Sequence, residues 1–294
     1  MCYIESMSRT ILPRACGLLV AMMWAQTARA APEVTFCDQT FEPRTTAVRC
    51  QLSTVTDLTP LASLSRLRSL YINGTGVADL TPLAGATRLE VLDADDTPVS
   101  DLTPLSKLRK LALLSLERTQ VTDLTPIAGL KRLEALFIDE TAVSELTPLA
   151  KLVRLQVLHA NYTPIDSLDG LQQLTKLRFV AMHRTAIADL SPLSKARRME
   201  FLSVGGSQVA DLRPLRKMTR LKRLYLGGTR IADLSPLKGL SSLWRLIIGG
   251  TQVKDLSPLY RVRSLRQLYL RQSEVPDVEV EALAAKNKRL RVAR

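Results

Sequence analysis

The hydrophobic residues of this chain recur with a period of 22 residues. Counting in steps of 22 from Ser53, a Thr or Ser returns at every step, without insertion, as far as Ser273. Around it each unit reads LxxLxLxxTxVxDLTPLxxL with small variations, as in Leu67, Leu70 and Ile72. So regular a repeat indicates a stack of similar small units rather than one irregular core.

Two shorter patterns coexist inside each unit. The LxLxx segment alternates like a short strand that buries one face. The next segment, such as Thr81, Pro82 and Leu83, predicts a helical turn in which the Thr hydroxyl is the N-cap and Pro takes the first helical position. Each unit is therefore strand, loop, helical turn and loop. No single unit can bury its apolar side, but stacked copies share one continuous interior.

This pattern resembles the leucine-rich repeat in the 22-residue form of internalin-like bacterial proteins. The resemblance covers roughly residues 48–292. It implies an α/β solenoid, a horseshoe with a curved parallel β-sheet of twelve strands on the concave side and short helical turns on the convex side. The family usually has Asn or Cys where this chain has Thr or Ser. We expect the hydroxyl to satisfy the loop backbone in place of the amide, with slightly weaker hydrogen bonding.

The N-terminal residues have the pattern of a secretory signal peptide. Arg9 and Arg14 precede an apolar run over residues 15–25, followed by the small-x-small site Ala28-Arg29-Ala30. The run is too short to span a bilayer, and no second apolar segment follows, so we expect no membrane span in the mature chain. Cleavage after Ala30 would yield a secreted or periplasmic protein.

Both ends of the repeat array are predicted to be capped. Cys37 and Cys50 remain after cleavage, an even pair in an oxidising compartment, and we expect them to form a disulfide that seals the first coil. At the other end, Leu290 and Val292 fall 22 residues after Leu268 and Leu270, with a helix predicted between them. The expected parts are a signal peptide at 1–30 and a repeat domain at 31–294. That domain divides into an N-terminal cap at 31–58, repeats at 59–276 and a C-terminal cap at 277–294.

Residues between the inward strand positions should form the concave face. This face runs from acidic to basic along the chain, with aromatic residues throughout, and Tyr, Phe and Arg on a polar wall are typical of binding hot spots. The predicted partner-binding residues are Tyr71, Asp93, Asp95, Phe137, His159, Tyr162, His183, Arg223, Tyr225, Arg245, Tyr269 and Arg271. Three later coils carry Gly-Gly after the strand, which either bares backbone for a ligand or simply eases the turn.

Charge forms two columns along the repeat. The chain is 46% hydrophobic and 4% aromatic with a net charge of +13, and residues 31–294 alone carry +11. A cation recurs just before the strand at Arg66, Arg88, Lys110, Arg132, Arg154, Lys176, Arg198 and Arg220. Duplication of a solvated surface residue explains this basic ladder most simply; the alternative is a rail for an anionic polymer such as cell-wall glycan or lipopolysaccharide. The export signal and the few aromatics near this edge argue against nucleic acid. An Asp column on the other edge either repeats a solvated residue or holds the loop before the Thr-Pro turn.

Catalytic and metal chemistry find little support in the sequence. The acidic residues would lie side by side on a sheet rather than across a cleft, and no nucleophile triad or phosphate-binding loop occurs. His159 and His183 are the only histidines, and a loose site of His183 with Asp139 in one column is conceivable. No tight ligand spacing accompanies it, so we predict no metal, no cofactor and no enzyme activity. The predicted function is an exported protein-binding protein that acts through its concave sheet; the alternative is a binder of anionic envelope polymers through the basic ladder.

Overall fold

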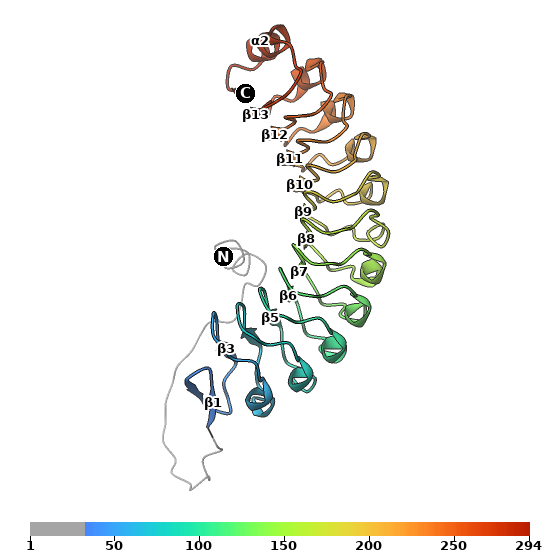
Figure 1. Ribbon diagram of the computed structural model, residues 1–294. Coiled ribbons are helices and arrows are strands. Elements are labelled where there is room, and N and C mark those ends of the chain that lie inside the picture. The colour runs from blue at the N-terminus through green and yellow to red at the C-terminus, as the bar shows by residue number, and fades with distance from the viewer. Residues whose placement is uncertain (1–32) are drawn as a thin grey trace, which may run out of the picture. The chain divides into compact units, whose positions relative to one another are not determined.

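A single curved solenoid makes up the described part of the chain. The computed structural model describes residues 33–294, so the predicted signal peptide lies outside the described residues. Twelve short strands form one parallel sheet on the concave side, and helical turns line the convex side (Figure 1). The strands are β3 (Ala47–Arg49), β4 (Ser69–Tyr71), β5 (Val91–Asp93), β6 (Leu113–Ser115), β7 (Ala135–Phe137), β8 (Val157–His159), β9 (Phe179–Ala181), β10 (Phe201–Ser203), β11 (Arg223–Tyr225), β12 (Arg245–Ile247), β13 (Gln267–Tyr269) and β14 (Arg291–Ala293).

The 22-residue period sets the strand register. The central residue of each strand points into the core and pairs with its equivalent one repeat later, as Leu70 does with Leu92 and Leu224 with Leu246. All four side chains are fully buried. The predicted α/β leucine-rich-repeat solenoid with twelve parallel strands is confirmed.

Short 3-10 helices occupy the predicted helical turns, but they are capped differently from the prediction. In the turn Thr81–Leu83, Leu80 is the N-cap residue and Thr81 is the first helical residue. The Thr hydroxyl does not cap; instead Asp79 Oδ1 accepts the Thr81 backbone N–H at 2.7 Å. The helices are η1 (Thr59–Ser63), η2 (Thr81–Leu83), η3 (Thr103–Lys107), η4 (Thr125–Ile127), η5 (Thr147–Lys151), η6 (Ser191–Leu193), η7 (Arg213–Leu215), η8 (Ser235–Gly239) and η9 (Ser257–Arg261).

The Asp column therefore holds the entry to these turns, the second of its two predicted roles. The same carboxylate-to-N–H contact, at 2.7–2.8 Å, recurs at Asp57, Asp79, Asp101, Asp123, Asp189, Asp211, Asp233 and Asp255. At Asp79, hydrogen bonds from the Thr81 side chain and then its backbone lower the carboxyl pKa. One coil has Gly170 where the other turns have Pro, and it has no helix between β8 and β9. There Gly170 has φ +99°, and a Cβ would lie 2.2 Å from the Leu146 carbonyl oxygen.

The repeated Thr or Ser closes a bend within its own coil. Nine of these hydroxyls donate to the carbonyl three residues earlier, at 2.6–2.9 Å, as Thr75 does to Ile72. Contacts between coils at this level come from the backbone instead, such as Gln120 N–H to Val99 O at 2.9 Å. Each hydroxyl thus makes one bond to its own coil, and the backbone links neighbouring coils.

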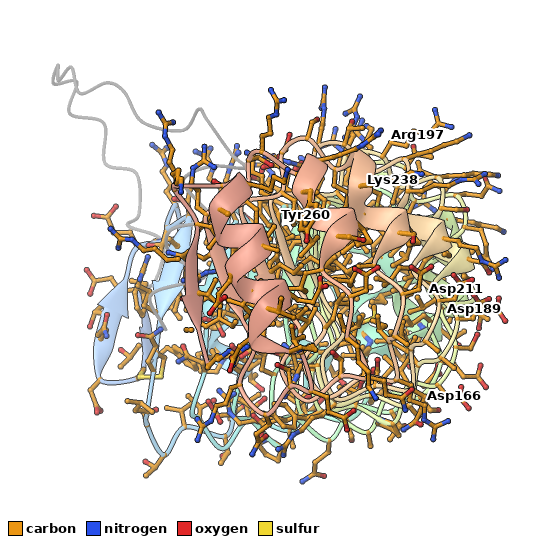
Figure 2. All side chains as sticks on the ribbon, turned by 90° about the horizontal axis from the view of Figure 1, so that it is seen from above. Asp166, Asp189, Arg197, Asp211, Lys238 and Tyr260 are labelled. Carbon is orange, nitrogen blue, oxygen red and sulfur yellow. A yellow bond between two sulfur atoms is a disulfide. The ribbon has the colours of Figure 1, made fainter. Side chains whose placement is uncertain are left out.

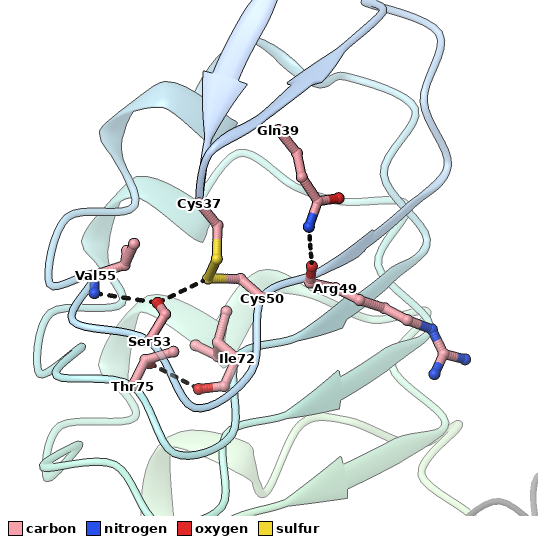
Figure 3. Close-up of a disulfide and its surroundings, with 8 residues drawn as sticks. All are labelled: Cys37, Gln39, Arg49, Cys50, Ser53, Val55, Ile72 and Thr75. Atoms are coloured by element: carbon pink, nitrogen blue, oxygen red, sulfur yellow. Dashed lines mark hydrogen bonds between the residues drawn. A yellow bond between two sulfur atoms is a disulfide. The ribbon is translucent and has the colours of Figure 1, made fainter.

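The N-terminal cap is a hairpin tied to the first coil. Strands β1 (Val34–Phe36) and β2 (Gln39–Phe41) pair antiparallel, and this hairpin is not apparent from the sequence pattern. Val34 and Phe36 pack into the core. The predicted disulfide between Cys37 and Cys50 is present, with a Cα–Cα distance of 5.8 Å (Figure 3). The hairpin therefore packs on the first coil of the core and is covalently linked to it by the disulfide.

The C-terminal cap contains the predicted helix but with a shifted last strand. Helix α2 (Asp277–Lys286) buries Leu283 in the core. Strand β14 places Val292, not Leu290, opposite Leu268. The prediction of an unbroken 22-residue step was wrong here, because α2 is longer than the turns it replaces. No helix among residues 33–294 is long and apolar enough to cross a membrane.

Candidate binding surface

Three columns of side chains make up the concave face. The first residue of each strand forms the strand-start column: Ser69, Val91, Leu113, Ala135, Val157, Phe179, Phe201, Arg223, Arg245 and Gln267. The last residue forms the strand-end column: Tyr71, Asp93, Ser115, Phe137, His159, Ala181, Ser203, Tyr225, Ile247 and Tyr269. The residue two positions later forms the post-strand column: Asn73, Asp95, Glu117, Asp139, Asn161, His183, Gly205, Gly227, Gly249 and Arg271.

The structure places eleven of the twelve predicted partner-binding residues in these columns. Tyr162 is the exception, since it lies one position beyond the post-strand column, in a turn residue with φ 57°. Its side chain still packs edge-on against His183, with ring centroids 5.5 Å apart. Whether these residues contact a partner stays a prediction.

An apolar stripe on the concave face is absent from the sequence-based prediction. Six consecutive coils present Val91, Leu113, Ala135, Val157, Phe179 and Phe201 in the strand-start column. Val91, Leu113, Ala135 and Val157 lie outside the core cluster of the solenoid but are buried, so that only Phe179 and Phe201 are half-exposed. Each directly precedes an inward aliphatic residue, so that pairs such as Val91-Leu92 look like core. The period-two alternation of a strand distinguishes these strand-start residues from the central residues, which point into the core.

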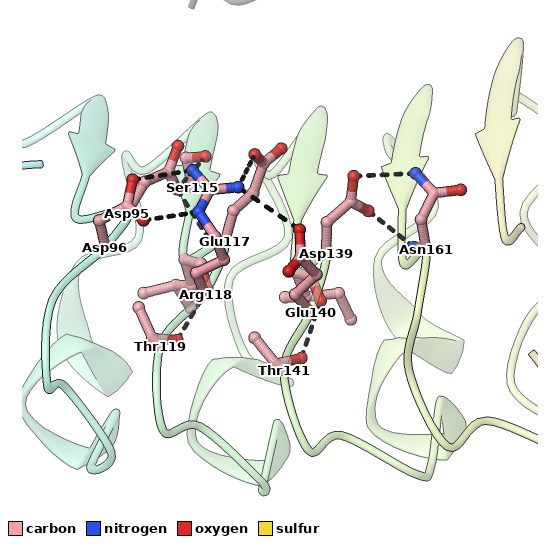
Figure 4. Close-up of polar contacts among 12 residues, drawn as sticks. Asp95, Asp96, Ser115, Glu117, Arg118, Thr119, Asp139, Glu140, Thr141 and Asn161 are labelled. Atoms are coloured by element: carbon pink, nitrogen blue, oxygen red, sulfur yellow. Dashed lines mark hydrogen bonds and ion pairs between the residues drawn. The ribbon is translucent and has the colours of Figure 1, made fainter. Parts of the chain in front are cut away.

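An acidic cluster lies beside this stripe, around one arginine. Six carboxylates come from three neighbouring coils: Asp93, Asp95, Asp96, Glu117, Asp139 and Glu140. Arg118 binds both carboxylate oxygens of Asp96, at 2.5 and 2.8 Å, and lies 3.5 Å from Glu117 and 3.8 Å from Glu140 (Figure 4). One cation thus faces several carboxylates, which leaves the cluster with net negative charge.

Some of these carboxylates also satisfy backbone groups of the next coil. Asp95 Oδ1 accepts the Glu117 N–H at 2.7 Å and the Ser115 hydroxyl at 2.6 Å. Asp139 accepts the Asn161 backbone N–H at 2.7 Å and its side-chain amide at 2.8 Å (Figure 4). The post-strand column is therefore held in place by bonds along the sheet.

Burial, together with the crowding of like charges, raises the pKa of two of these carboxyl groups. Burial, and then repulsion from Asp95, raises the pKa of Asp93 to about 6. Burial, and then the charges of Asp95 and Asp139, raises the pKa of Glu117 to about 7. Asp93 and Glu117 therefore exchange protons near pH 6 and pH 7, where most other carboxyl groups are already ionised.

The two histidines have different surroundings. His159 lies in the strand-end column and packs edge-on against Phe137, with ring centroids 5.0 Å apart. It groups with Glu117 and Asp139, one ligand atom from each lying within 4.8 Å of the others. His183 shares the column of Asp139 but forms no such group among the described residues. Asp139 therefore groups with its diagonal neighbour His159 rather than with His183 of its own column.

The later coils carry a connected set of arginines and aromatic rings. Arg245 donates to the Tyr225 hydroxyl at 3.2 Å, to the Tyr269 hydroxyl at 3.1 Å and to Gln267 Oε1 at 2.5 Å. The Arg223 guanidinium lies 4.7 Å from the centre of the Phe201 ring. Bonding by Tyr225 raises the pKa of Arg245, which stays charged. These side chains are held in place before any partner arrives.

The Gly-Gly pairs have a sufficient structural explanation. The second Gly of each pair has φ between 65° and 71°, the left-handed region that Gly adopts without strain. The first Gly faces the next coil, and a Cβ on Gly249 would lie 2.3 Å from the Arg271 carbonyl oxygen. Turn geometry and close coil packing thus account for both glycines.

The basic ladder lies on one edge of the solenoid. All eight of its residues are exposed, and none forms an ion pair with another described residue. Side-chain nitrogens gather along the edge near Arg197 and Lys238, while Asp189 and Asp211 lie apart from it (Figure 2). A shallow depression of about 550 Å³ on this edge is lined by Arg197, Arg198, Arg216, Lys217, Thr219 and Arg220. It contains five cationic side chains and no carboxylate.

Known structures share this architecture. No protein-family model matches the chain, and no curated protein matches it. An internalin (InlF) of Listeria monocytogenes is 24% identical with a TM-score of 0.78, covering 87% of this chain and 83% of that one. The functional domain of InlJ, also from Listeria monocytogenes, is 18% identical with a TM-score of 0.66, covering 86% and 64%. The plant peptide hormone receptor RGFR1, solved with RGF2, is 17% identical with a TM-score of 0.67, covering 79% and 40%. This chain has the leucine-rich-repeat solenoid fold of these internalins.

Proposed function

We propose that this protein is an exported binding protein that recognises a protein partner through its concave sheet. The observation that carries the proposal is the arrangement of the strand-start column. Phe179 and Phe201 are half-buried in this column, next to Arg223 and Arg245, and the acidic cluster lies on the coils at the other end of the face. A surface with an apolar centre and charges of both signs around it suits a protein segment better than a uniform polymer.

The expected partner follows from this charge pattern. Its segment opposite coils β5 to β7 should be basic, and its segment opposite β11 to β13 should carry acidic groups. Apolar side chains between them would meet Phe179 and Phe201, which are half-exposed. RGFR1 offers a precedent for the fold class, since it is a peptide hormone receptor solved with RGF2.

Export is supported by two independent features. The first thirty residues have a signal-peptide pattern, and Cys37 and Cys50 form a disulfide. Structural disulfides persist in oxidising compartments, outside the cytosol. We therefore place the protein in the periplasm or the secreted fraction, with release after Ala30.

A pull-down tests the concave proposal. Residues 31–294 would be immobilised and incubated with envelope extract at physiological salt, beside a variant with Arg223, Tyr225, Arg245 and Tyr269 changed to Ala. A matched control changes Arg197, Arg198, Arg216 and Arg220 to Ala on the edge. The proposal expects a discrete protein retained by the wild type and the edge control but lost by the concave variant. Equal retention by the concave variant would exclude this face.

The basic edge is a second candidate site, for an anionic envelope polymer. The depression lined by five cations without a carboxylate favours it. Binding there would release counterions and fall steeply as salt rises. The edge variant should then lose polymer binding while the concave variant keeps it, which separates the two functions in one experiment.

A further inference from the structure

Three metal-ligating side chains meet on the concave face. Glu117 follows β6, Asp139 follows β7, and His159 ends β8, so each comes from a different neighbouring coil. One ligand atom from each lies within 4.8 Å of the other two. A single ion bound at about 2 Å from each atom requires ligand atoms no farther apart than roughly 4 Å, so small side-chain adjustments suffice.

Both carboxylates keep coordination sites available. Each Asp139 oxygen accepts one hydrogen bond from Asn161, and a carboxylate oxygen has two lone pairs. These two bonds also fix the orientation of the carboxylate, as outer partners do for metal ligands. Glu117 contacts Arg118 through Oε2 at 3.5 Å, which leaves Oε1 for another cation.

The surrounding charge favours a cation at this position. Asp95 lies one coil before Glu117 in the post-strand column, Asp93 lies in the same coil as Asp95, and Arg118 is engaged mainly with Asp96. A divalent ion would therefore offset repulsion that the apo cluster retains.

We propose that Glu117, Asp139 and His159 form a binding site for a divalent transition-metal ion of the zinc class. One imidazole nitrogen and two carboxylate oxygens suit zinc, cobalt or nickel better than calcium, which prefers oxygen ligands alone. Three protein ligands leave at least one position open on a partner-facing surface. This site goes beyond the proposed recognition of a protein and does not depend on it.

The composition of the mature chain makes the test selective. His159 and His183 are its only histidines, and both of its cysteines are in the disulfide. No thiolate therefore competes for zinc. His183 lies one coil further along the same face and is a matched control.

The experiment titrates tag-free residues 31–294 with Zn²⁺ by calorimetry and follows both imidazoles by NMR. We expect one equivalent of Zn²⁺ to bind and the His159 ring signals alone to shift. His159→Ala and Glu117→Gln should each weaken binding about tenfold or more, while His183→Ala should not change it. Far-UV circular dichroism and the melting temperature confirm that each variant is folded.

Two results would overturn the site. One is the absence of stoichiometric binding to the folded wild type. The other is binding that His183→Ala weakens as much as His159→Ala does, which would indicate adventitious surface binding. A variant that fails to fold is replaced by Asp139→Asn, which keeps the shape of the side chain and one acceptor oxygen.

Discussion

The two halves of the concave face are built on the same repeat yet stabilised in opposite ways. In coils β5 to β7 six carboxylates surround Arg118, and several of them are tied to backbone N–H groups of the next coil. In coils β10 to β13 arginines lie over aromatic rings and donate to tyrosine hydroxyls. The first half retains electrostatic repulsion, whereas the second is a closed network. The first half should therefore respond to charge, salt and pH, and the second to loss of packing.

Removing the disulfide should produce the largest effect and should act on the acidic half. We expect Cys37→Ala with Cys50→Ala to cost about 3 kcal/mol, because the closed loop no longer restricts the unfolded chain. Coils of a solenoid contact only their neighbours, so hydrogen exchange should accelerate in β3 to β6 before β11 to β13. Gln39→Ala, which removes one bond to Arg49 O, is the control. Uniform acceleration along the sheet would contradict this expectation.

Paired arginine substitutions should separate the halves by their salt dependence. Arg118→Ala leaves the carboxylates without their nearest cation and should cost about 1 kcal/mol at low salt and less at high salt, where repulsion is screened. Arg245→Ala removes hydrogen bonds and ring contacts and should cost about 1 kcal/mol at both salt concentrations. Urea unfolding at low and high NaCl measures both. An equal salt response of the two variants would remove the distinction between the halves.

The acidic half should also determine how stability varies above pH 5. The pKa of Asp93 is raised to about 6 and that of Glu117 to about 7 in the folded protein, above their ordinary values. The stability that these protonated carboxyl groups contribute is therefore complete at low pH. It is lost as the pH rises through 6 and 7, because both groups then ionise in the folded protein. We expect Asp93→Asn with Glu117→Gln to remove about 1 to 2 kcal/mol of this loss between pH 5 and pH 8.

Thermal melts from pH 5 to pH 8 test that slope. Tyr269→Phe, in the other half, should leave it unchanged. A slope that survives the double variant would assign the pH dependence to other groups.

The smallest expected effect concerns the turn after each strand. The acidic half places Glu140 in the left-handed region at φ 56°, where the later coils use Gly228 at φ 70°. We expect Glu140→Gly to be slightly stabilising and Gly228→Ala to cost about 1 kcal/mol, because side chains with a Cβ are strained there. A Cβ on Gly228 has room, because its nearest contact would be 3.7 Å away. The loss of stability in Gly228→Ala therefore measures backbone strain without a steric clash. Equal stability of Gly228→Ala and wild type by urea unfolding would argue against this strain.

The repeat made the fold predictable, because 22-residue spacing fixes the register of every strand from Val48 to Leu268. It failed where the spacing changes. Helix α2 needs more residues than a 3-10 turn, so Val292 rather than Leu290 enters the register. The Thr hydroxyl was assigned to the helical turn, but the Asp two residues earlier accepts the bond, since its carboxylate reaches the free N–H directly.

The site was harder to predict, because it depends on neighbours across strands. Residues 22 positions apart can be recognised in the sequence as columns on the sheet. This spacing correctly predicted that Arg245 and Tyr269 lie on the same face. Diagonal contacts are not visible, so His159 was separated from Asp139. The apolar strand-start column was missed because Val91 and Val157 adjoin inward aliphatic residues in the sequence and are themselves buried.

The central claim, that the concave sheet binds a protein, is tested most directly by site-specific photo-crosslinking. A benzophenone amino acid would replace Phe179 on the concave face, Arg198 on the basic edge or Tyr260 on the convex side, each in residues 31–294 with envelope extract. The account predicts a discrete crosslinked protein from position 179 that resists high salt, and none from position 260. Crosslinks from position 198 alone, or equally from all three positions, would contradict it.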